Sequence, residues 1–365
     1  MKDDTCLAVA GTHGKTTTTS LLAWTLAVAG CDPSYIIGGV SKNMGNNAHA
    51  GKGPYFVIEA DEYDGMFLGL NPAWAIVTNM EHDHPDCYPT PEDYLAAFSA
   101  FTRRVQSGGG LLVCGDDPAL RQLGSHVPAG AQSLTYGLSP ENNYFAQSLA
   151  VEAGGVSRFN LVYQGKTLLS VVMPLPGEHN VRNALAVLGL CHQLGIDLHQ
   201  AARALASFSG TGRRFDILGV SQNITLIDDY GHHPTEIRAT LQAARSRYPQ
   251  NRIWAVWQPH TFSRTMTLMA DFINAFQAAD DVVVTEVYAA RESNPGFSAA
   301  QLVEKMEHPH KHFSPSIDEA TSYLKNNVQP GDVVLVLSAG DANLISAHLL
   351  DYLNKTSSEK ELSNG

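Results

Sequence analysis

The chain has 365 residues, 44% of them hydrophobic and 16% charged, a composition typical of a globular protein that folds around a sizeable core without disulfides or structural metals. Its formal net charge of −12 argues against a nucleic-acid or anionic-membrane surface, so a phosphate site must be a local group of cations and backbone amides that binds a small molecule. Five cysteines without a CxxC pair fit a reducing compartment, and no run of about 20 apolar residues occurs, so we expect a cytoplasmic protein.

The first half of the chain alternates short apolar runs with helical patterns. Buried strands are predicted at 6–10, 55–60, 74–79 and 111–115, and helices at 15–29 and 91–105. Such alternation is typical of a parallel sheet with crossover helices. From 143 to 175 the pattern changes to alternation around glycine-containing turns, which predicts an antiparallel patch on the edge of that sheet.

A second α/β series begins after the break "SGTG" at 209–212. Its strands are predicted in "ITLIDDY", "RIWAVWQ", "DDVVVTEV" and "DVVLVLSAG". We therefore expect one domain over 1–209 and a second over 210–353. The polar residues 354–365 are expected to form a disordered tail.

The stretch "GTHGKTT" stands between a predicted strand and a predicted helix. Two glycines let backbone amides turn toward an anion, the lysine supplies a cation, and the following threonine is placed to bind the magnesium that accompanies nucleotide phosphates. A plain glycine turn is the alternative, because Val9 stands where the usual loop has its first glycine. The order of strand, Gly-Lys-Thr and helix favours nucleotide phosphate binding by Gly11, Thr12, His13, Gly14, Lys15, Thr16 and Thr17.

Acidic side chains crowd the end of the next strand, in "VIEADEYD". The four carboxylates are those of Glu59, Asp61, Glu62 and Asp64. Their repulsion is relieved most simply by a divalent cation, and Mg²⁺ is favoured by oxygen ligands and phosphate partners. A solvated acidic loop is the alternative for each residue taken singly, but we expect at least one of them to hold metal.

Histidines and aspartates follow a further strand in "TNMEHDHPDCY". The run resembles the HxHxDH pattern of zinc-dependent hydrolases, but Cys87 stands in place of the last histidine and a phosphate loop has no use in such an enzyme. His84 beside a nucleotide-bound magnesium is the favoured interpretation.

Three loops of the second half combine basic and acidic residues at predicted strand ends. They are "SGTGRRFD" with Arg213 and Arg214, "LIDDYGHHPTEI" with Asp228, Asp229, His232 and His233, and "WQPHTFSRT" with His260 and Arg264. The arginines suit neutralisation of a transferring phosphoryl group. Ligands of open α/β sheets collect at such edges, although each loop by itself could be an ordinary cap or surface turn.

These motifs together resemble the Mur ligases, the ATP-dependent enzymes that form the amide bonds of the peptidoglycan stem peptide. The matching segments are "GTHGKTTTTS", "IEADEYD", "TNMEHDHPD", "GEHNVRNALA", "GTGRRFD", "DDYGHHPTEI" and "QPHTFSRT". The last three are most similar to members that join L-alanine to a muramic acid nucleotide sugar. The alternatives are a recycling ligase that attaches a murein tripeptide to the same sugar, a relative acting on another carboxylate, and a non-catalytic ATP-binding fragment.

The resemblance implies a fold and a set of roles. The fold is α/β, with a P-loop central ATPase domain of mainly parallel sheet plus an antiparallel patch and a Rossmann-like C-terminal domain that binds the amino acid. The implied roles are phosphate and Mg²⁺ binding for Lys15 and Thr16, metal binding for Glu59 and His84, adenine nucleotide binding for His179, Asn180 and Asn183, phosphate binding for Arg214 and Asp229, and amino-acid binding for His232, His260 and Arg264. Lys15, Arg214 and His84 are the implied catalytic residues.

The resemblance also implies a mechanism in which a muramyl carboxylate takes the γ-phosphate of ATP and the resulting acyl phosphate is attacked by the amine of L-alanine. Members of this family that act on muramate carry an N-terminal UDP-binding domain. Only about ten residues precede the phosphate loop here, so that domain is expected to be missing or to be a separate polypeptide.

Overall fold

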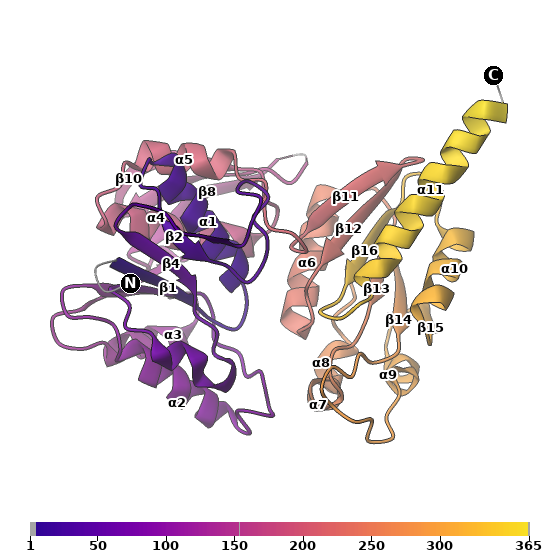
Figure 1. Cartoon of the computed structure of the whole chain (residues 1–365), viewed down its shortest axis with the longest axis horizontal. Helices are drawn as coiled ribbons and strands as arrows, with labels where there is room; N and C mark the ends of the chain where they lie inside the picture. Colours follow the sequence, from indigo (N-terminus) through magenta and orange to yellow (C-terminus); the bar gives the residue numbers. More distant parts are fainter. Residues whose placement is uncertain (1–4, 153, 364–365) are drawn as a thin grey trace. The chain divides into compact units, whose positions relative to one another are not determined.

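The computed structural model describes residues 5–152 and 154–363, which form two compact units. The N-terminal unit is Met1–Gly212 and the C-terminal unit is Arg213–Gly365 (Figure 1). The division lies three residues after the expected boundary at 209, within the "SGTG" break. Each unit has its own sheet and its own hydrophobic core.

The N-terminal unit is built on a ten-stranded sheet. Its strands, in spatial order, are β10 (Lys166–Met173), β9 (Ser157–Tyr163), β8 (Tyr144–Val151), β7 (Gln132–Gly137), β6 (Gly110–Cys114), β5 (Trp74–Val77), β1 (Thr5–Ala10), β4 (Tyr55–Glu59), β2 (Ser34–Ile36) and β3 (Ala48–His49). Pairing is parallel from β2 through β8 and antiparallel among β8, β9 and β10. The expected parallel sheet with an antiparallel patch is confirmed.

Helices cover both faces of this sheet (Figure 1). They are α1 (Lys15–Val28), α4 (Glu178–Gln193) and α5 (Leu198–Ala206), which contact one another, and α2 (Pro91–Thr102) and α3 (Pro118–Leu123), with short 3-10 turns at Tyr63–Gly69 and Gly124–His126. The central strands are buried on both faces, which is why their sequences are continuous apolar runs and not alternating ones. The helices predicted at 15–29 and 91–105 are α1 and α2, each slightly shorter than expected.

The strand order brings three loops together at one edge of this sheet. Strand β1 lies between β4 and β5, and all three run parallel. Their carboxyl ends therefore share an edge, and the segments that leave it are "GTHGKTT" after β1, "ADEYD" after β4 and "TNMEHDHPD" after β5. Motifs that are far apart in the sequence are neighbours here because of the parallel pairing.

The C-terminal unit has a six-stranded sheet with a core on each face. The strands, in spatial order, are β11 (Asp216–Ser221), β12 (Ile224–Asp229), β16 (Val333–Leu337), β13 (Ile253–Trp257), β14 (Asp281–Thr285) and β15 (Lys311–Ser314). Only β11 pairs antiparallel. Alternate residues of one strand enter opposite cores: Ile227 packs in one and Leu226 in the other.

Helices again lie on both sides of the C-terminal sheet (Figure 1). They are α6 (Pro234–Arg247), α7 (Phe262–Thr267), α8 (Met269–Phe272), α9 (Ala299–Lys305), α10 (Ile317–Asn327) and α11 (Asn343–Ser363). The expected disordered tail over 354–365 is corrected as far as Ser363, because α11 continues through that residue, and residues 364–365 lie outside the described part. Within the described ranges, no helix is both long enough and apolar enough to cross a membrane.

Candidate active site

The segment 11–17 ("GTHGKTT"), called the phosphate loop below, has a backbone conformation that depends on its two glycines. Gly11 has φ +134°, and a Cβ there would clash with the Thr78 hydroxyl. Gly14 has φ +79° and is the N-cap of α1. Because glycine brings no side chain to cap the helix, the first amides of α1 remain directed toward an incoming anion.

Lys15 is held by Glu62, one of the four carboxylates that the sequence indicates as candidate metal ligands. The Lys15 Nζ lies 2.9 Å from Glu62 Oε1 and 2.7 Å from Oε2, and it also donates to the Gly11 carbonyl at 2.6 Å. Burial acts to lower the Lys15 pKa, but the charge and hydrogen bond of Glu62, together with the charges of Glu59 and Asp61, outweigh it and the pKa is raised. Burial acts to raise the Glu62 pKa, but the charge of Lys15 and the hydrogen bonds from His84 and Lys15 together outweigh it and the pKa is lowered. Both groups are therefore charged at neutral pH.

Several other side chains surround Glu62. His84 Nε2 lies 3.5 Å from Glu62 Oε1, and the Tyr94 hydroxyl donates to the same oxygen at 3.4 Å. Tyr88 donates its hydroxyl proton to the Glu62 carbonyl. His82 contacts the Tyr88 carbonyl at 2.7 Å, so the two histidines of "EHDHPD" have separate partners and do not converge on one metal as in a zinc hydrolase.

Thr16 and Glu59 form an oxygen-rich pair beside the loop. The Thr16 hydroxyl donates to Glu59 Oε1 at 2.9 Å, and the Gly38 amide donates to Glu59 Oε2 at 2.6 Å. A Cβ on Gly38 would stand 2.7 Å from either Glu59 oxygen, so glycine is needed for this approach. A hydroxyl at the start of α1 and a carboxylate at the end of β4 are a donor set that fits Mg²⁺.

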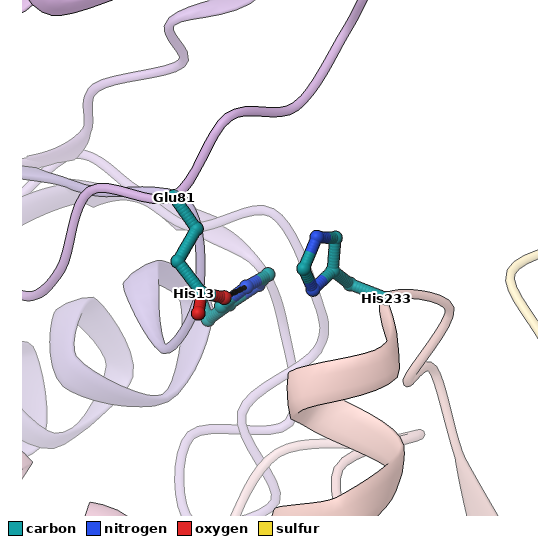
Figure 2. A group of neighbouring side chains, drawn as sticks. All are labelled: His13, Glu81 and His233. Carbon is teal, nitrogen blue, oxygen red and sulfur yellow. Dashed lines mark hydrogen bonds and ion pairs between the residues drawn. The ribbon is translucent and has the colours of Figure 1, made fainter. Parts of the chain in front are cut away.

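The segment after β5 fixes the other side of the phosphate loop. Asn79 accepts the His13 amide at 2.8 Å and donates to the His13 carbonyl at 3.1 Å, and the Thr78 hydroxyl donates to the same carbonyl at 2.6 Å. Figure 2 shows the His13 imidazole beside the Glu81 carboxylate, at 2.8 Å. The Thr12 hydroxyl contacts the Glu81 backbone and the Tyr94 hydroxyl, each at 2.9 Å. Thr12 and His13 are thus built into the loop.

The start of α4 lies against the phosphate loop. A Cβ on Gly14 would stand 3.1 Å from Asn183 Oδ1, so the two are in contact. Asn183 donates to Asn180 at 3.4 Å, and Asn180 donates to the Pro176 carbonyl at 2.7 Å. His179, next to them, is half-buried. The structure therefore brings the expected adenine-nucleotide residues next to the phosphate loop.

In the C-terminal unit, Arg213 connects two loops. Its guanidinium donates to the Ser338 carbonyl at 2.6 Å and to the Gly340 carbonyl at 3.2 Å, and its Nε lies 3.4 Å from Asp228 Oδ2. Burial raises the Asp228 pKa to about 6, although Arg213 opposes the shift. Through these contacts Arg213 connects the segment "SGTGRRFD" to the loop after β16.

Asp229 also shapes these loops. One oxygen accepts the Phe215 amide and the other the Gly231 amide, both at 2.7 Å, and burial raises the pKa of this carboxyl. Arg214 lies 3.6 Å from Glu236 and 5.0 Å from the centre of the Tyr230 ring. Asp229 thus fixes the backbone at Phe215 and at Gly231, and the Arg214 guanidinium lies over the Tyr230 ring.

The two histidines of "GHHP" stand at the start of α6. His233 is its N-cap, with Nδ1 3.3 Å from the Thr235 amide (Figure 2). The His232 amide donates to Glu236 at 3.0 Å. The centre of the His232 ring lies 5.9 Å from the centre of the His260 ring, so two of the expected amino-acid-binding residues are neighbours.

His260 and Arg264 are adjacent at the end of β13. Arg264 Nη1 lies 3.1 Å from His260 Nδ1, and only 5% of Arg264 is exposed. The His260 ring stacks on Tyr288, with the ring centres 5.7 Å apart. Thr261, which follows His260 in the chain, has φ +64°, a costly conformation for a β-branched residue. Its amide donates to the Tyr288 carbonyl at 2.9 Å. The strained turn at Thr261 places both side chains.

Sequence reasoning missed several residues of both sites. Tyr94 and Asn79 hold the phosphate loop, and Tyr288 and Gln258 support the edge after β13. Gln258 donates to Asp341 at 2.7 Å and accepts the Ser338 hydroxyl at 2.8 Å, which ties β13 to the loop after β16. The segment "LSAGDANL", which holds the Gln258 partners Ser338 and Asp341, does carry a signal, because its sequence is typical of an anion-binding turn or a helix cap.

Taken by themselves, the two units define a class: a phosphate-loop α/β unit followed by a second α/β unit with a basic and histidine-rich edge. Residues 9–191 match the Mur ligase middle domain, and residues 213–340 match the domain described as Mur ligase, glutamate ligase domain. The chain belongs to the Mur ligase family, whose members are ATP-dependent ligases.

Particular relatives narrow the comparison. The UDP-N-acetylmuramate--L-alanine ligase of Caldanaerobacter subterraneus subsp. tengcongensis is 39% identical over 354 residues, covering 96% of this chain and 76% of the relative. The enzyme of the same name from Roseiflexus sp. (strain RS-1) is 42% identical over 365 residues, covering 96% and 78%. The crystal structure of the UDP-N-acetylmuramate-alanine ligase from Thermotoga maritima matches with a TM-score of 0.82 and 29% identity, covering 97% of this chain and 76% of that one. A murein peptide ligase from Psychrobacter arcticus 273-4 matches with a TM-score of 0.69 and 25% identity, covering 96% and 78%.

Proposed function

We propose that this chain joins L-alanine to UDP-N-acetylmuramate at the expense of ATP, in the synthesis of peptidoglycan precursors. The observation that carries the proposal is that relatives named for that reaction are 39% and 42% identical to this chain over 96% of its length. The structure supports it with a phosphate loop in the N-terminal unit and a paired histidine and arginine in the C-terminal unit.

The phosphate loop supplies the groups that an ATP-dependent ligase needs. Lys15 and the amides at the start of α1 would bind the β- and γ-phosphates, and Arg214 would neutralise the transferring phosphoryl group. Phosphoryl transfer to the muramyl carboxylate depends mainly on positioning and charge neutralisation. The free amine of L-alanine would then attack the acyl phosphate and release inorganic phosphate.

Thr16, Glu59 and His84 are the proposed metal ligands. The Thr16 hydroxyl already donates to Glu59, and His84 lies beside Glu62. Mg²⁺, when bound, would supply positive charge at the phosphates of ATP. Glu59 is also fixed by the Gly38 amide, so its carboxylate is oriented before any ion arrives.

The amino-acid pocket is proposed at His232, His260 and Arg264. The Arg264 guanidinium suits the carboxylate of an amino acid, because it offers paired donors in one plane. Its 5% exposure and its contact with His260 limit its motion, so the guanidinium is held in place before an amino acid binds.

A product assay tests the proposal directly. The full chain is incubated with ATP, Mg²⁺, UDP-N-acetylmuramate and either L-alanine or the murein tripeptide, and the nucleotide sugar is followed by mass spectrometry. Growth of the sugar by one alanine supports the proposal. Addition of the tripeptide in preference to alanine would instead show the recycling reaction. Neither product, together with ADP binding in a separate calorimetric titration, would show a non-catalytic nucleotide-binding protein.

A further inference from the structure

We propose that Glu62 is a positioning residue of the phosphate loop, which holds Lys15 and His84 in place and competes with nucleotide phosphates for the Lys15 ammonium. This rests on the proposed function, because it assigns a role within the same nucleotide site. From the sequence, Glu62 was one of four candidate metal ligands; in the structure it is the partner of the loop lysine.

The donors of Lys15 are already occupied. An ammonium has three N–H donors. Around Nζ stand four acceptors: the Gly11 carbonyl at 2.6 Å, the Thr12 carbonyl at 3.3 Å, and the Glu62 oxygens at 2.7 and 2.9 Å. A phosphate oxygen can therefore gain a Lys15 donor only by displacing one of these acceptors. Glu62 is the one among them that carries a full negative charge.

Glu62 differs from the acidic residues around it in burial. It is 0% exposed, whereas Asp61 and Asp64 are exposed. A buried carboxylate that loses its counterion is costly, so Glu62 does not release Lys15 freely. His84 at 3.5 Å and the Tyr94 hydroxyl at 3.4 Å are additional partners of Glu62 Oε1, and they link the lysine to the proposed metal ligand.

This geometry predicts opposite effects on binding and on turnover. The Glu62 charge offsets part of the attraction between Lys15 and a nucleotide, so its removal should strengthen nucleotide binding in the ground state. The same removal frees the lysine and the imidazole from a fixed geometry, so transition-state stabilisation should fall. A carboxylate that merely kept the loop folded would affect both quantities in the same direction.

The experiment compares the full chain with Glu62→Gln, which keeps the shape and removes the charge. We expect the Kd for ADP without Mg²⁺, measured by calorimetry, to fall several-fold, and kcat for phosphate release with the complete substrate set to fall by at least about tenfold. Asp61→Asn is the matched control: it removes a neighbouring charge that also acts on Lys15, but from an exposed side chain whose carboxylate accepts the Tyr63 amide at 3.1 Å. Both its Kd and its kcat should stay within about twofold of the wild type.

Three results would overturn the proposal. They are weaker ADP binding by Glu62→Gln together with lower kcat, an unchanged kcat, and an equal gain of ADP affinity in Asp61→Asn. If Glu62→Gln does not fold, Glu62→Asp replaces it; this variant keeps the charge but withdraws the carboxylate, and a wild-type kcat there contradicts the positioning role. Absence of phosphate release from the wild type would count against the proposed function, whereas the ADP measurement still tests Glu62.

Discussion

The Thr16 hydroxyl donates a hydrogen bond to Glu59 at 2.9 Å, although the two are 43 positions apart in the chain. Thr16 is the second residue of α1, and Glu59 is the last residue of β4, which lies beside β1 in the sheet. Parallel pairing of β1 with β4 therefore brings the helix start and the strand end to the same edge. The two oxygen groups that we propose as metal ligands, one from a helix and one from a strand, are thus already held together.

Glu59→Gln should raise the Mg²⁺ concentration that turnover requires. The amide oxygen can accept the Thr16 hydroxyl but carries no charge to attract a cation, so about tenfold or more Mg²⁺ should be needed for half-maximal phosphate release. Glu92→Gln, on the exposed first turn of α2, is the control for charge. An unchanged Mg²⁺ requirement in Glu59→Gln would remove Glu59 from the proposed metal site.

Gly11→Ala should damage the phosphate loop through its backbone. The residue has φ +134° and a Cβ would clash with the Thr78 hydroxyl, so the loop must move away from β5. We expect ADP affinity to fall by about tenfold or more. Gly30→Ala is the control, since its φ of +78° brings a similar strain but no atom lies within 4 Å of the added methyl.

The control variant should lose about 1 kcal/mol of unfolding free energy and bind ADP normally. Calorimetric titration with ADP gives the affinity of both variants, and urea unfolding gives their free energies of unfolding. Equal ADP affinity for Gly11→Ala and wild type would show that the observed loop backbone is not needed for nucleotide binding.

The arrangement of the loops could be predicted from the sequence, because apolar runs mark parallel strands and ligand-binding loops follow their carboxyl ends. The partner of Lys15 could not. Strand β4 ends at Glu59, and Asp64 at φ +52° and Gly65 at φ +65° take left-handed conformations shortly after it. In this irregular segment Glu62 is buried while Asp61 is exposed, a difference that neither a strand period nor a helix period predicts.

Asp228 should make the stability of the protein depend on pH. Burial raises its folded-state pKa to about 6, above the value of about 4 in an unfolded chain, so the folded state keeps a proton that the unfolded state loses. Its contribution is complete below pH 4 and is lost as the pH rises through 6. Arg213 opposes the shift, while Asp229 and Asp216 add to it.

The measurement is the unfolding free energy of Asp228→Asn relative to wild type, from urea titrations at pH 4 and pH 7. Asparagine does not titrate, so the variant should gain up to about 3 kcal/mol on the wild type between these pH values. A difference that is constant with pH would mean that Asp228 titrates at the same pH in both states.

Arg264→Lys should raise the KM for L-alanine by about tenfold or more and leave the KM for ATP unchanged, if Arg264 pairs with the amino-acid carboxylate through two donors. A lysine keeps the charge but offers no planar pair of donors. Arg238→Lys, on an exposed position of α6, is the matched control. Equal changes in both KM values would indicate that Arg264 supports the fold of the C-terminal unit instead.

The surroundings of Arg264 also show where sequence reasoning stops. "QPHTFSRT" indicated His260 and Arg264, but Tyr288 comes from the loop after the neighbouring strand β14, and nothing in its local sequence marks it. Its place depends on the register between β13 and β14 and on the strained turn at Thr261. Such pairings arise from tertiary packing, which local patterns do not encode.

The most direct test of the account is phosphate release by the full chain with ATP, Mg²⁺, UDP-N-acetylmuramate and L-alanine, measured beside the same reactions lacking one substrate and beside Lys15→Ala. We predict release that requires both the nucleotide sugar and alanine and that disappears in Lys15→Ala, because the lysine is the fixed cation of the phosphate loop. Release that continues without the acceptor or the amino acid, or that survives the loss of Lys15, would contradict the ligase account.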